Sequence, residues 1–418
     1  MKRIAIIISV LFLLIIGFLG SMYVVRKSDI KNQYVGSSST RILSIAIDDL
    51  LLDNVTSILP WNSNQKENGQ GKDLFKNIIF NAGIYIPARI YLFDTTPHMR
   101  QLYGILALKN YDDCFSFFAN EFPDGIDLID KEKGIVSVTI NNHIKVLFNR
   151  SHFIYEIAVE NKTNFSDLQA ILEQPTSWTK IDSISGFEGV ISQKHISYIQ
   201  KDGALQIQGM ISKHHTQVDG KWTLSQSLSD TIRQRTMDTT KQVITFWNLL
   251  PLNEIPVLAE IMSKYTGVNL SQINSAYFDL QVKDEFAIHK DSSITYTYDD
   301  DFNPKEQIQV QEIQVPNITY SWSFNKLLAE SLPDTLFYKF HKKQTSEFLI
   351  NSTFESFPAQ VTSQKTKHPL YFFIDFGKWP ATWNLAITNR LKDKKVKVKL
   401  LTTLENPKNM HISGEITY

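Results

Sequence analysis

Apolar and polar residues alternate along much of this chain, and a period of two predicts strands with one buried face. In the first half these segments are rich in β-branched and aromatic residues, and Asn141-Asn142 is predicted as a tight turn between two of them. Short helices are expected between the strands. The predicted strands are 41–47, 88–93, 102–108, 134–140, 143–148 and 153–159, and the predicted helices are 50–59, 73–83, 111–122 and 165–173.

A β-meander is predicted from Gly186 to Leu224. Its hairpin turns are predicted at Lys201-Asp202-Gly203 and Asp219-Gly220, because Asp-Gly pairs favour the backbone conformations that tight turns need. His214-His215 ends one of its strands. Since neighbouring strand residues point to opposite faces, we expect two solvent-facing side chains there, and not a metal site.

The pattern of the first half returns after Ile244. A predicted helix ends at Gly267 and leads through Val268-Asn269-Leu270 into a strand, just as Gly83 leads through Ile84-Tyr85-Ile86 into a strand. This match indicates an internal repeat. The later predicted strands are 276–282, 294–298, 308–315, 319–323, 335–339, 347–354, 370–376, 395–401 and 411–417, and the helices are 253–265 and 326–331.

The chain begins with an uncharged apolar run from Ile4 to Val25, bounded by Lys2-Arg3 and Arg26-Lys27. As a helix it would be roughly 33 Å long, enough to cross a bilayer. We therefore expect a single-pass signal anchor, with a short cytoplasmic stub and the bulk of the chain on the periplasmic or extracytoplasmic side. A cleaved signal peptide is the alternative, but the run is longer than a usual signal sequence and lacks a typical cleavage site.

Together these patterns predict an α+β fold. An N-terminal transmembrane helix is followed by two related halves with mainly antiparallel sheets and short helices. The predicted divisions are a cytoplasmic stub and transmembrane anchor at 1–27, a tether at 28–40, a first α+β unit at 41–180, a β-meander at 181–243 and a second α+β unit at 244–418.

Charge excludes one class of partner. Lysine plus arginine and aspartate plus glutamate balance at 43 each, so the chain lacks the basic excess typical of nucleic-acid binding, and we expect no nucleic-acid partner. The basic run from Lys392 to Lys399 is explained by a half-buried strand with a wet basic face. Contact with anionic lipid or an acidic partner is the alternative for that run.

Candidate chemistry is sparse. Asp299 to Glu306 is the densest group of oxygen ligands, but it lacks the spacing of a calcium-binding loop, and we expect a solvated hairpin loop there instead of a cation site. The single cysteine, Cys114, is expected to be a buried small hydrophobe. No nucleophile elbow, zinc-protease, phosphate-binding, dinucleotide-binding or C-x-x-C motif occurs in the sequence. We therefore expect no enzyme, and we assign no catalytic, cofactor-binding or metal residues.

The segment from Asn81 to Val159 resembles uncharacterised bacterial membrane-anchored envelope proteins, a domain of unknown function with repeated α+β halves. The residues that carry the resemblance are Gly83-Ile84-Tyr85-Ile86, 90–93, 104–108 with 111–118, and Gly267-Val268-Asn269-Leu270 in the second block. Tyr85 stands where an Asp is frequent in that pattern. The resemblance implies an envelope domain and supplies no catalytic residues.

The expected function is a membrane-anchored binding or scaffold protein of the cell envelope, which presents its exported domain to a protein partner. The first alternative is a lipid-binding or lipid-transfer protein, and the second is a hydrolase assembled from scattered carboxylates. A continuous apolar groove would favour lipid handling, an exposed apolar patch over a closed core would favour binding, and converging carboxylates would favour catalysis.

Overall fold

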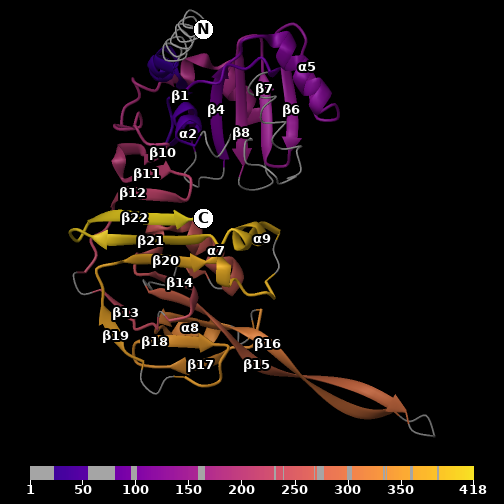
Figure 1. Cartoon of the computed structure of the whole chain (residues 1–418), viewed down its shortest axis with the longest axis vertical. Coiled ribbons are helices and arrows are strands. Elements are labelled where there is room, and N and C mark those ends of the chain that lie inside the picture. Colours follow the sequence, from indigo (N-terminus) through magenta and orange to yellow (C-terminus); the bar gives the residue numbers. More distant parts are fainter. Residues whose placement is uncertain are drawn as a thin grey trace, which may run out of the picture. The chain divides into compact units, whose positions relative to one another are not determined.

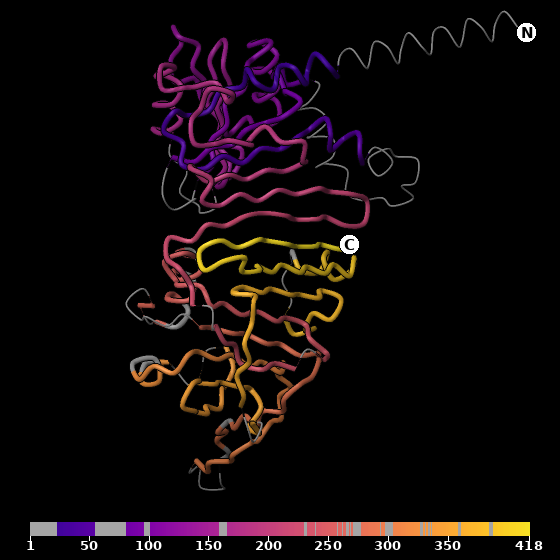
Figure 2. The backbone as a smooth tube through the Cα atoms, turned by 90° about the vertical axis from the view of Figure 1, so that its left-hand side faces the viewer, coloured from indigo at the N-terminus to yellow at the C-terminus, as the bar shows by residue number. Residues whose placement is uncertain are grey.

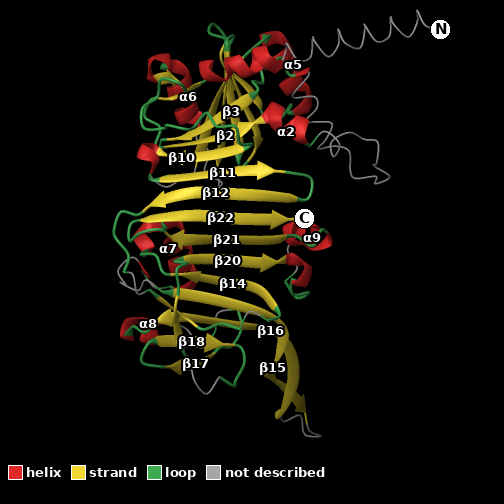
Figure 3. Cartoon of the chain, turned by 60° about the vertical axis from the view of Figure 1, so that its left-hand side comes forward, coloured by secondary structure: helices red, strands yellow, loops and turns green. Residues whose placement is uncertain are grey.

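The computed structural model describes residues 23–54, 81–95, 101–158, 165–229, 232–238, 240–267, 269–270, 277–298, 304–332, 335, 337–357, 361–383 and 386–418. The chain divides into two compact units, Met1–Lys213 and His214–Tyr418. The division after Lys213 falls inside the segment 181–243 that was predicted as a separate meander. Strands provide most of the regular structure of each unit (Figure 3).

Unit 1 is built on an antiparallel sheet in which some neighbouring strands come from distant parts of the sequence (Figure 1). The strand Arg41–Ala46 pairs on one side with the next strand of the sheet in the sequence and on the other side with Ile196–Gln200. The chain therefore starts in the middle of the sheet and returns there later. The order is β11 (Leu205–Ile211), β10 (Ile196–Gln200), β2 (Arg41–Ala46), β3 (Arg89–Asp94), β4 (Gln101–Ala107), β8 (His152–Ala158), β7 (Ile144–Phe148), β6 (Ile135–Asn141) and β5 (Ile126–Asp130).

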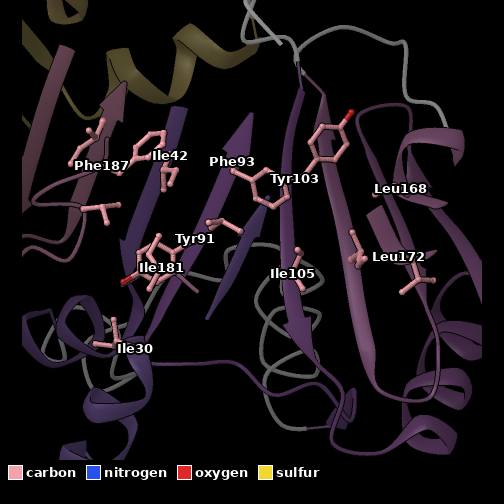
Figure 4. Close-up of a cluster of buried hydrophobic side chains, with 14 of the residues drawn as sticks. Ile30, Ile42, Tyr91, Phe93, Tyr103, Ile105, Leu168, Leu172, Ile181 and Phe187 are labelled. Atoms are coloured by element: carbon pink, nitrogen blue, oxygen red, sulfur yellow. The ribbon is translucent and has the colours of Figure 1, made fainter. Parts of the chain in front are cut away.

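Helices cover the unit 1 sheet and close its core. α5 (Tyr111–Glu121) begins at Asn110, whose side chain accepts hydrogen bonds from the backbone N–H groups of Asp112 and Asp113. α6 (Phe165–Glu173) buries Leu168 and Leu172. Figure 4 shows these two leucines in one apolar cluster with side chains from the sheet, including Phe93 and Tyr103, whose ring centroids are 6.0 Å apart.

Hydrogen bonds and an ion pair join the first described residues to the helix α2 (Ile47–Asp53) of unit 1. Residues 23–28 are helical, and Arg26 forms two hydrogen bonds of 2.8 Å with Asp48 in α2, while Tyr23 donates to Asp49 at 2.7 Å. Residues 28–40 were predicted as a tether. In the structure they form η1 (Asp29–Asn32) and β1 (Tyr34–Gly36), which pairs with β9 (Trp178–Lys180), and they bury Ile30 and Val35 in the unit 1 core.

Unit 2 also contains a long antiparallel sheet. Figure 2 shows its C-terminal strands, in yellow, lying side by side. The order is β12 (His215–Thr223), β22 (Asn409–Thr417), β21 (Lys397–Leu404), β20 (Leu370–Asp375), β14 (Gln242–Asn248), β15 (Phe278–Tyr298), β16 (Pro304–Ser323), β18 (Phe348–Ser352) and β17 (His341–Gln344). A second, two-stranded sheet pairs β13 (Arg233–Arg235) with β19 (Ser363–Lys365).

The helices of unit 2 are short. α7 (Pro256–Thr266) ends at Gly267, which has a φ of 70° in the left-handed region that a glycine cap adopts without strain. The others are α8 (Lys326–Ser331) and α9 (Ala386–Asp393). The predicted helix end at Gly267 is therefore confirmed.

The two units share an order of elements. In unit 1, β2 is followed by α2, and β3 and β4 then pair as a hairpin beside β2. In unit 2, β14 is followed by α7, and β15 and β16 pair as a hairpin beside β14. Gly83, which has a φ of 61°, and Gly267 hold equivalent places before the two hairpins.

The predicted fold class was wrong. The regular structure is mostly antiparallel strand, with only short helices, so the α+β assignment overstated the helices. No helix within the described ranges is long and apolar enough to cross a membrane, and an N-terminal transmembrane helix is not seen. Of the predicted span from Ile4 to Val25, only the last three residues are described. They are helical together with Arg26 and Lys27, which bind carboxylates of α2.

The meander prediction was partly wrong. Asp202 and Gly203 have positive φ values of 60° and 67°, which confirms the predicted turn at 201–203. Asp219 and Gly220 instead lie inside β12, because β22 pairs with that whole strand and holds it extended.

The contact between Gly104 and Tyr155 generates a stability prediction. These residues lie directly opposite each other on β4 and β8, and the Tyr155 ring fills the place that a Cβ at position 104 would take. We expect Gly104→Ala to lower the free energy of unfolding by about 1–3 kcal/mol, because the ring must move. In a Tyr155→Ala background the same substitution should cost much less, and equal costs in both backgrounds by urea unfolding would contradict the contact.

Cys114 generates a second prediction. Its side chain is fully buried in unit 1, as predicted, and burial raises the pKa of its thiol to about 12. The unfolded thiol titrates near 8.5, so this group stabilises the fold below about pH 8.5 and its contribution is lost as the pH rises further. We expect iodoacetamide to label Cys114 only when urea unfolds the chain, as followed by mass spectrometry. Rapid labelling of the folded protein would contradict the burial.

Candidate functional site

The most prominent feature of unit 2 is a hairpin that leaves its sheet (Figure 1). β14 pairs with β15 only as far as Lys283, and a β-bulge separates Lys283 from Phe286. From Phe286 and Pro316 outward, β15 and β16 pair only with each other among the strands that the structure describes. We call residues 286–298 and 304–316 the arm.

One face of the arm is apolar and exposed. Ile294 and Ile308 lie directly opposite each other in the register, and opposite residues share a face. The exposed fractions are 56% for Ile294, 57% for Tyr296, 66% for Ile308 and 60% for Val310, and we call these four side chains the apolar face. Exposed large apolar side chains gathered on one projecting element mark a contact surface.

Two runs within the arm lack the usual protection of free strand edges. Natural edge strands carry lysines, prolines or bulges that block pairing with another chain. The run Ser292 to Thr297 contains no charge and no proline, and neither does the run Gln307 to Gln311 on the other strand. The free edge β17, in contrast, carries Lys342 and Lys343. The arm is therefore open to an added strand.

A groove of about 1120 Å³ lies at the base of the arm. Its apolar lining includes Ile313, Val315 and Phe337. Its polar lining includes His289, whose Nε2 donates a 2.8 Å hydrogen bond to the carbonyl of Thr353. Charged side chains of both signs complete the lining: Lys290, Asp291, Lys339 and Glu355. The groove is thus mixed in character and is not a continuous apolar channel.

A second cavity, of about 500 Å³, is lined by charged side chains that are each held in an ion pair. Lys283 lies 2.7 Å from Asp238, and its hydrogen bond lowers the pKa of that carboxyl. Glu285 pairs with Lys241 at 3.1 Å and accepts a hydrogen bond from Asn317 at 3.1 Å, which together lower the pKa of Glu285. These carboxylates are thus held as paired anions and are poor candidates for general acids.

A buried ion pair lies beside this cavity, in the strands that continue into the arm. The guanidinium of Arg235 binds both carboxylate oxygens of Asp279, at 2.7 and 2.9 Å, and Asp279 is fully buried. Ser321 and Tyr277 also donate to Asp279. Burial raises the pKa of Tyr277, and the nearby Asp279 raises it further. This network ties β13 to β15 and β16 just inside the arm.

In unit 1, a contact between a histidine and a carboxylate lies beside a cavity of about 340 Å³. His195 is buried, and its Nε2 lies 2.8 Å from the carboxylate of Asp53. Its Nδ1 accepts a 2.9 Å hydrogen bond from the backbone N–H of Ile211. Because both ring nitrogens have partners, neither is available to accept a proton from a substrate.

Among the residues considered in the sequence, those that the structure describes form no metal-binding group. Asp299 to Asp301 lie outside the described residues, and Glu306 accepts a hydrogen bond from Tyr296 at 3.3 Å. In the basic run, Lys397 pairs with Asp375 at 3.2 Å. No group of His, Cys, Asp and Glu in the described part of the chain could hold a metal ion.

Sequence reasoning missed the arm. It predicted separate strands at 294–298, 308–315 and 319–323, where the structure has two continuous strands of 21 and 20 residues. The signal that could have revealed the arm was the alternation of apolar and polar residues, which begins at Phe286 and continues to Pro316 on the returning strand.

Comparison with known proteins assigns the chain to no family. No protein-family model matches the chain, and no curated protein matches it. Two solved structures are similar in part, crystal forms III and IV of TP0453. They have TM-scores of 0.25, are 11% and 9% identical, and cover 76% and 77% of this chain and 90% and 94% of their own. Scores this low carry no argument about function, and the resemblance to envelope proteins remains a prediction.

The buried ion pair generates a prediction with a matched control. Asp279→Asn should lower the free energy of unfolding by about 3–5 kcal/mol, because it leaves the Arg235 charge buried without a counter-charge. Asp238→Asn breaks an ion pair whose carboxylate is half exposed and should cost less than about 1 kcal/mol. Urea unfolding of both variants checks this, and equal costs would contradict the assignment.

Proposed function

We propose that this chain is a binding or scaffold protein and that the arm is its contact element. One observation carries the proposal: the arm holds exposed apolar side chains on one face, and beyond Phe286 neither of its strands pairs with a third strand among the described residues. A two-stranded hairpin is at best marginally stable in water by itself, so an element built in this way gains from being covered by a partner.

The alternatives receive less support from the same structure. The groove at the base of the arm could hold part of an acyl chain against Ile313, Val315 and Phe337, but charged and histidine side chains interrupt its lining. Catalysis would need a group free to exchange protons, and the strongest candidates, His195, Asp279 and Asp238, are each bound to partners.

The cell envelope, with the bulk of the chain on the extracytoplasmic side, is the location we propose. This part rests on the sequence alone and is independent of the arm. Protease treatment of spheroplasts, whose outer envelope layers have been removed, tests it. A body outside the cytoplasmic membrane would be degraded and an internal one protected.

A shortened arm tests the binding role. Ser292 and Val310 lie directly opposite each other, so replacing residues 293–309 with Asn-Gly should rejoin the strands through a two-residue turn in the same register. This variant loses Ile294, Tyr296 and Ile308 but keeps the groove. We expect the full chain, extracted in mild detergent and captured by a tag, to retain a protein partner that the shortened variant loses.

The control is Ile42→Val, a mild change in the buried core of unit 1, which should leave capture unchanged. If the shortened variant recovers the same partners in the same amounts, the arm is not the contact element. Lipid recovered equally with both proteins, and no protein partner, would favour the groove instead.

A further inference from the structure

We infer that the arm's partner is a second copy of this chain, paired edge to edge through β15 in antiparallel register centred on Ile294. The inference rests on the proposed binding role of the arm and names its partner. It is carried by the edge of β15, by the uncharged run Ser292 to Thr297 and by the positions of Lys290 and Asp291 beside that run.

The β15 edge has the properties of a pairing edge. Over 286–298 the strand pairs only with β16 within the described residues, so the backbone groups on its other side have no strand partner. Six consecutive uncharged residues match the usual length of one strand. Thr, Ile and Tyr within the run also favour extended structure.

Two-fold symmetry suits this edge. With Ile294 opposite Ile294 of the second copy, position 292 meets position 296, position 291 meets 297 and position 290 meets 298. Lys290 and Asp291 therefore each meet an uncharged residue, and no like charges are opposed. Because opposite residues share a face, the apolar faces of the two arms join into one surface across four strands.

The same test disfavours the edge of β16. A two-fold axis at Gln309 would place Glu306 opposite Glu312, and like charges directly opposite each other are destabilising. An axis at Ile308 would instead place Glu312 opposite Pro304, which has no N–H group to donate. β15 has no proline between Phe286 and Tyr298, so its edge is the better pairing edge.

The length of the arm allows the pairing. In the proposed register Tyr298, the last residue of β15, lies beside Lys290 of the other copy. Lys290 is four residues outward from Phe286, where the arm leaves the sheet. The paired segments thus lie wholly on the arms, and the sheets of the two copies need not overlap.

A lipid bilayer fits the arm less well than a second copy does. Lipid could cover the apolar face, but it offers no hydrogen bonds to the open strand edges, and unpaired backbone groups are costly in hydrocarbon. A strand from a second copy covers the apolar side chains and also pairs with one edge.

Cysteine cross-linking tests the register in the full chain. Ile294→Cys places two thiols directly opposite each other about the two-fold axis, and Cys114 is too buried to compete. We expect a disulfide-linked dimer on a non-reducing gel after mild oxidation. Ile308→Cys is the matched control, since it replaces the opposite residue of the same arm, but in the dimer its two copies are separated by both β15 strands.

Charge insertion gives a second readout in solution. Ile294→Lys places two positive charges opposite each other and should shift the chain several-fold toward monomer by light scattering in mild detergent. Ile308→Lys makes the same change on the strand away from the proposed interface and should keep the dimer. Because both replace an exposed isoleucine, a difference between them reports on the interface and not on folding.

Each outcome of these experiments supports or contradicts the inference. A disulfide-linked dimer of the Ile294→Cys variant, together with the Ile294→Lys effect, supports the inference. A monomeric wild-type chain overturns it, and so does cross-linking of the Ile308→Cys variant that is as efficient as that of the Ile294→Cys variant. If the wild-type chain is monomeric while its arm still captures a different protein, the inference fails and the proposed function stands. If neither copy nor protein is captured through the arm, both fail.

Discussion

The structure depends on the pairing of backbone hydrogen-bonding groups across antiparallel strands. In both units strands from distant parts of the sequence meet, as where β14 lies between β15 and β20. A paired strand has its N–H and C=O groups satisfied, and this is what makes a long sheet stable. On the arm, the outer edges of β15 and β16 have no strand partner among the residues that the structure describes, and exposed apolar side chains lie on the same element.

The base of the arm shows how such an element is held. Asp279 on β15 and Ser321 on β16 are bound to each other, and Arg235 from β13 closes over both. An ion pair buried in this way is a weak source of net stability, but its geometry is specific. Its position just inside the bulge indicates a positioning role, since it fixes the strands from which the arm begins.

Much of the local structure could be predicted from the sequence, because its signals are local. The helix α5 was predicted to within one residue, and its start at Asn110 is a side-chain cap; the hairpin at Asn141-Asn142 depends on residues within the turn. The arm was missed because Pro316 and the charged pair Asp284-Glu285 resemble strand ends. The ion pair of Arg235 and Asp279 joins positions 44 residues apart, and no local sequence pattern predicts such a long-range contact.

The equivalent hairpins of the two units differ greatly in length. In unit 1 the pair β3 and β4 has strands of 6 and 7 residues, whereas β15 and β16 have 21 and 20. Both occupy the same place in the order of elements, so a hairpin there can lengthen without altering which strands are neighbours in the sheet. The distance to which this hairpin projects from the sheet can thus change independently of the core, when pairs of opposite residues are added at its loop.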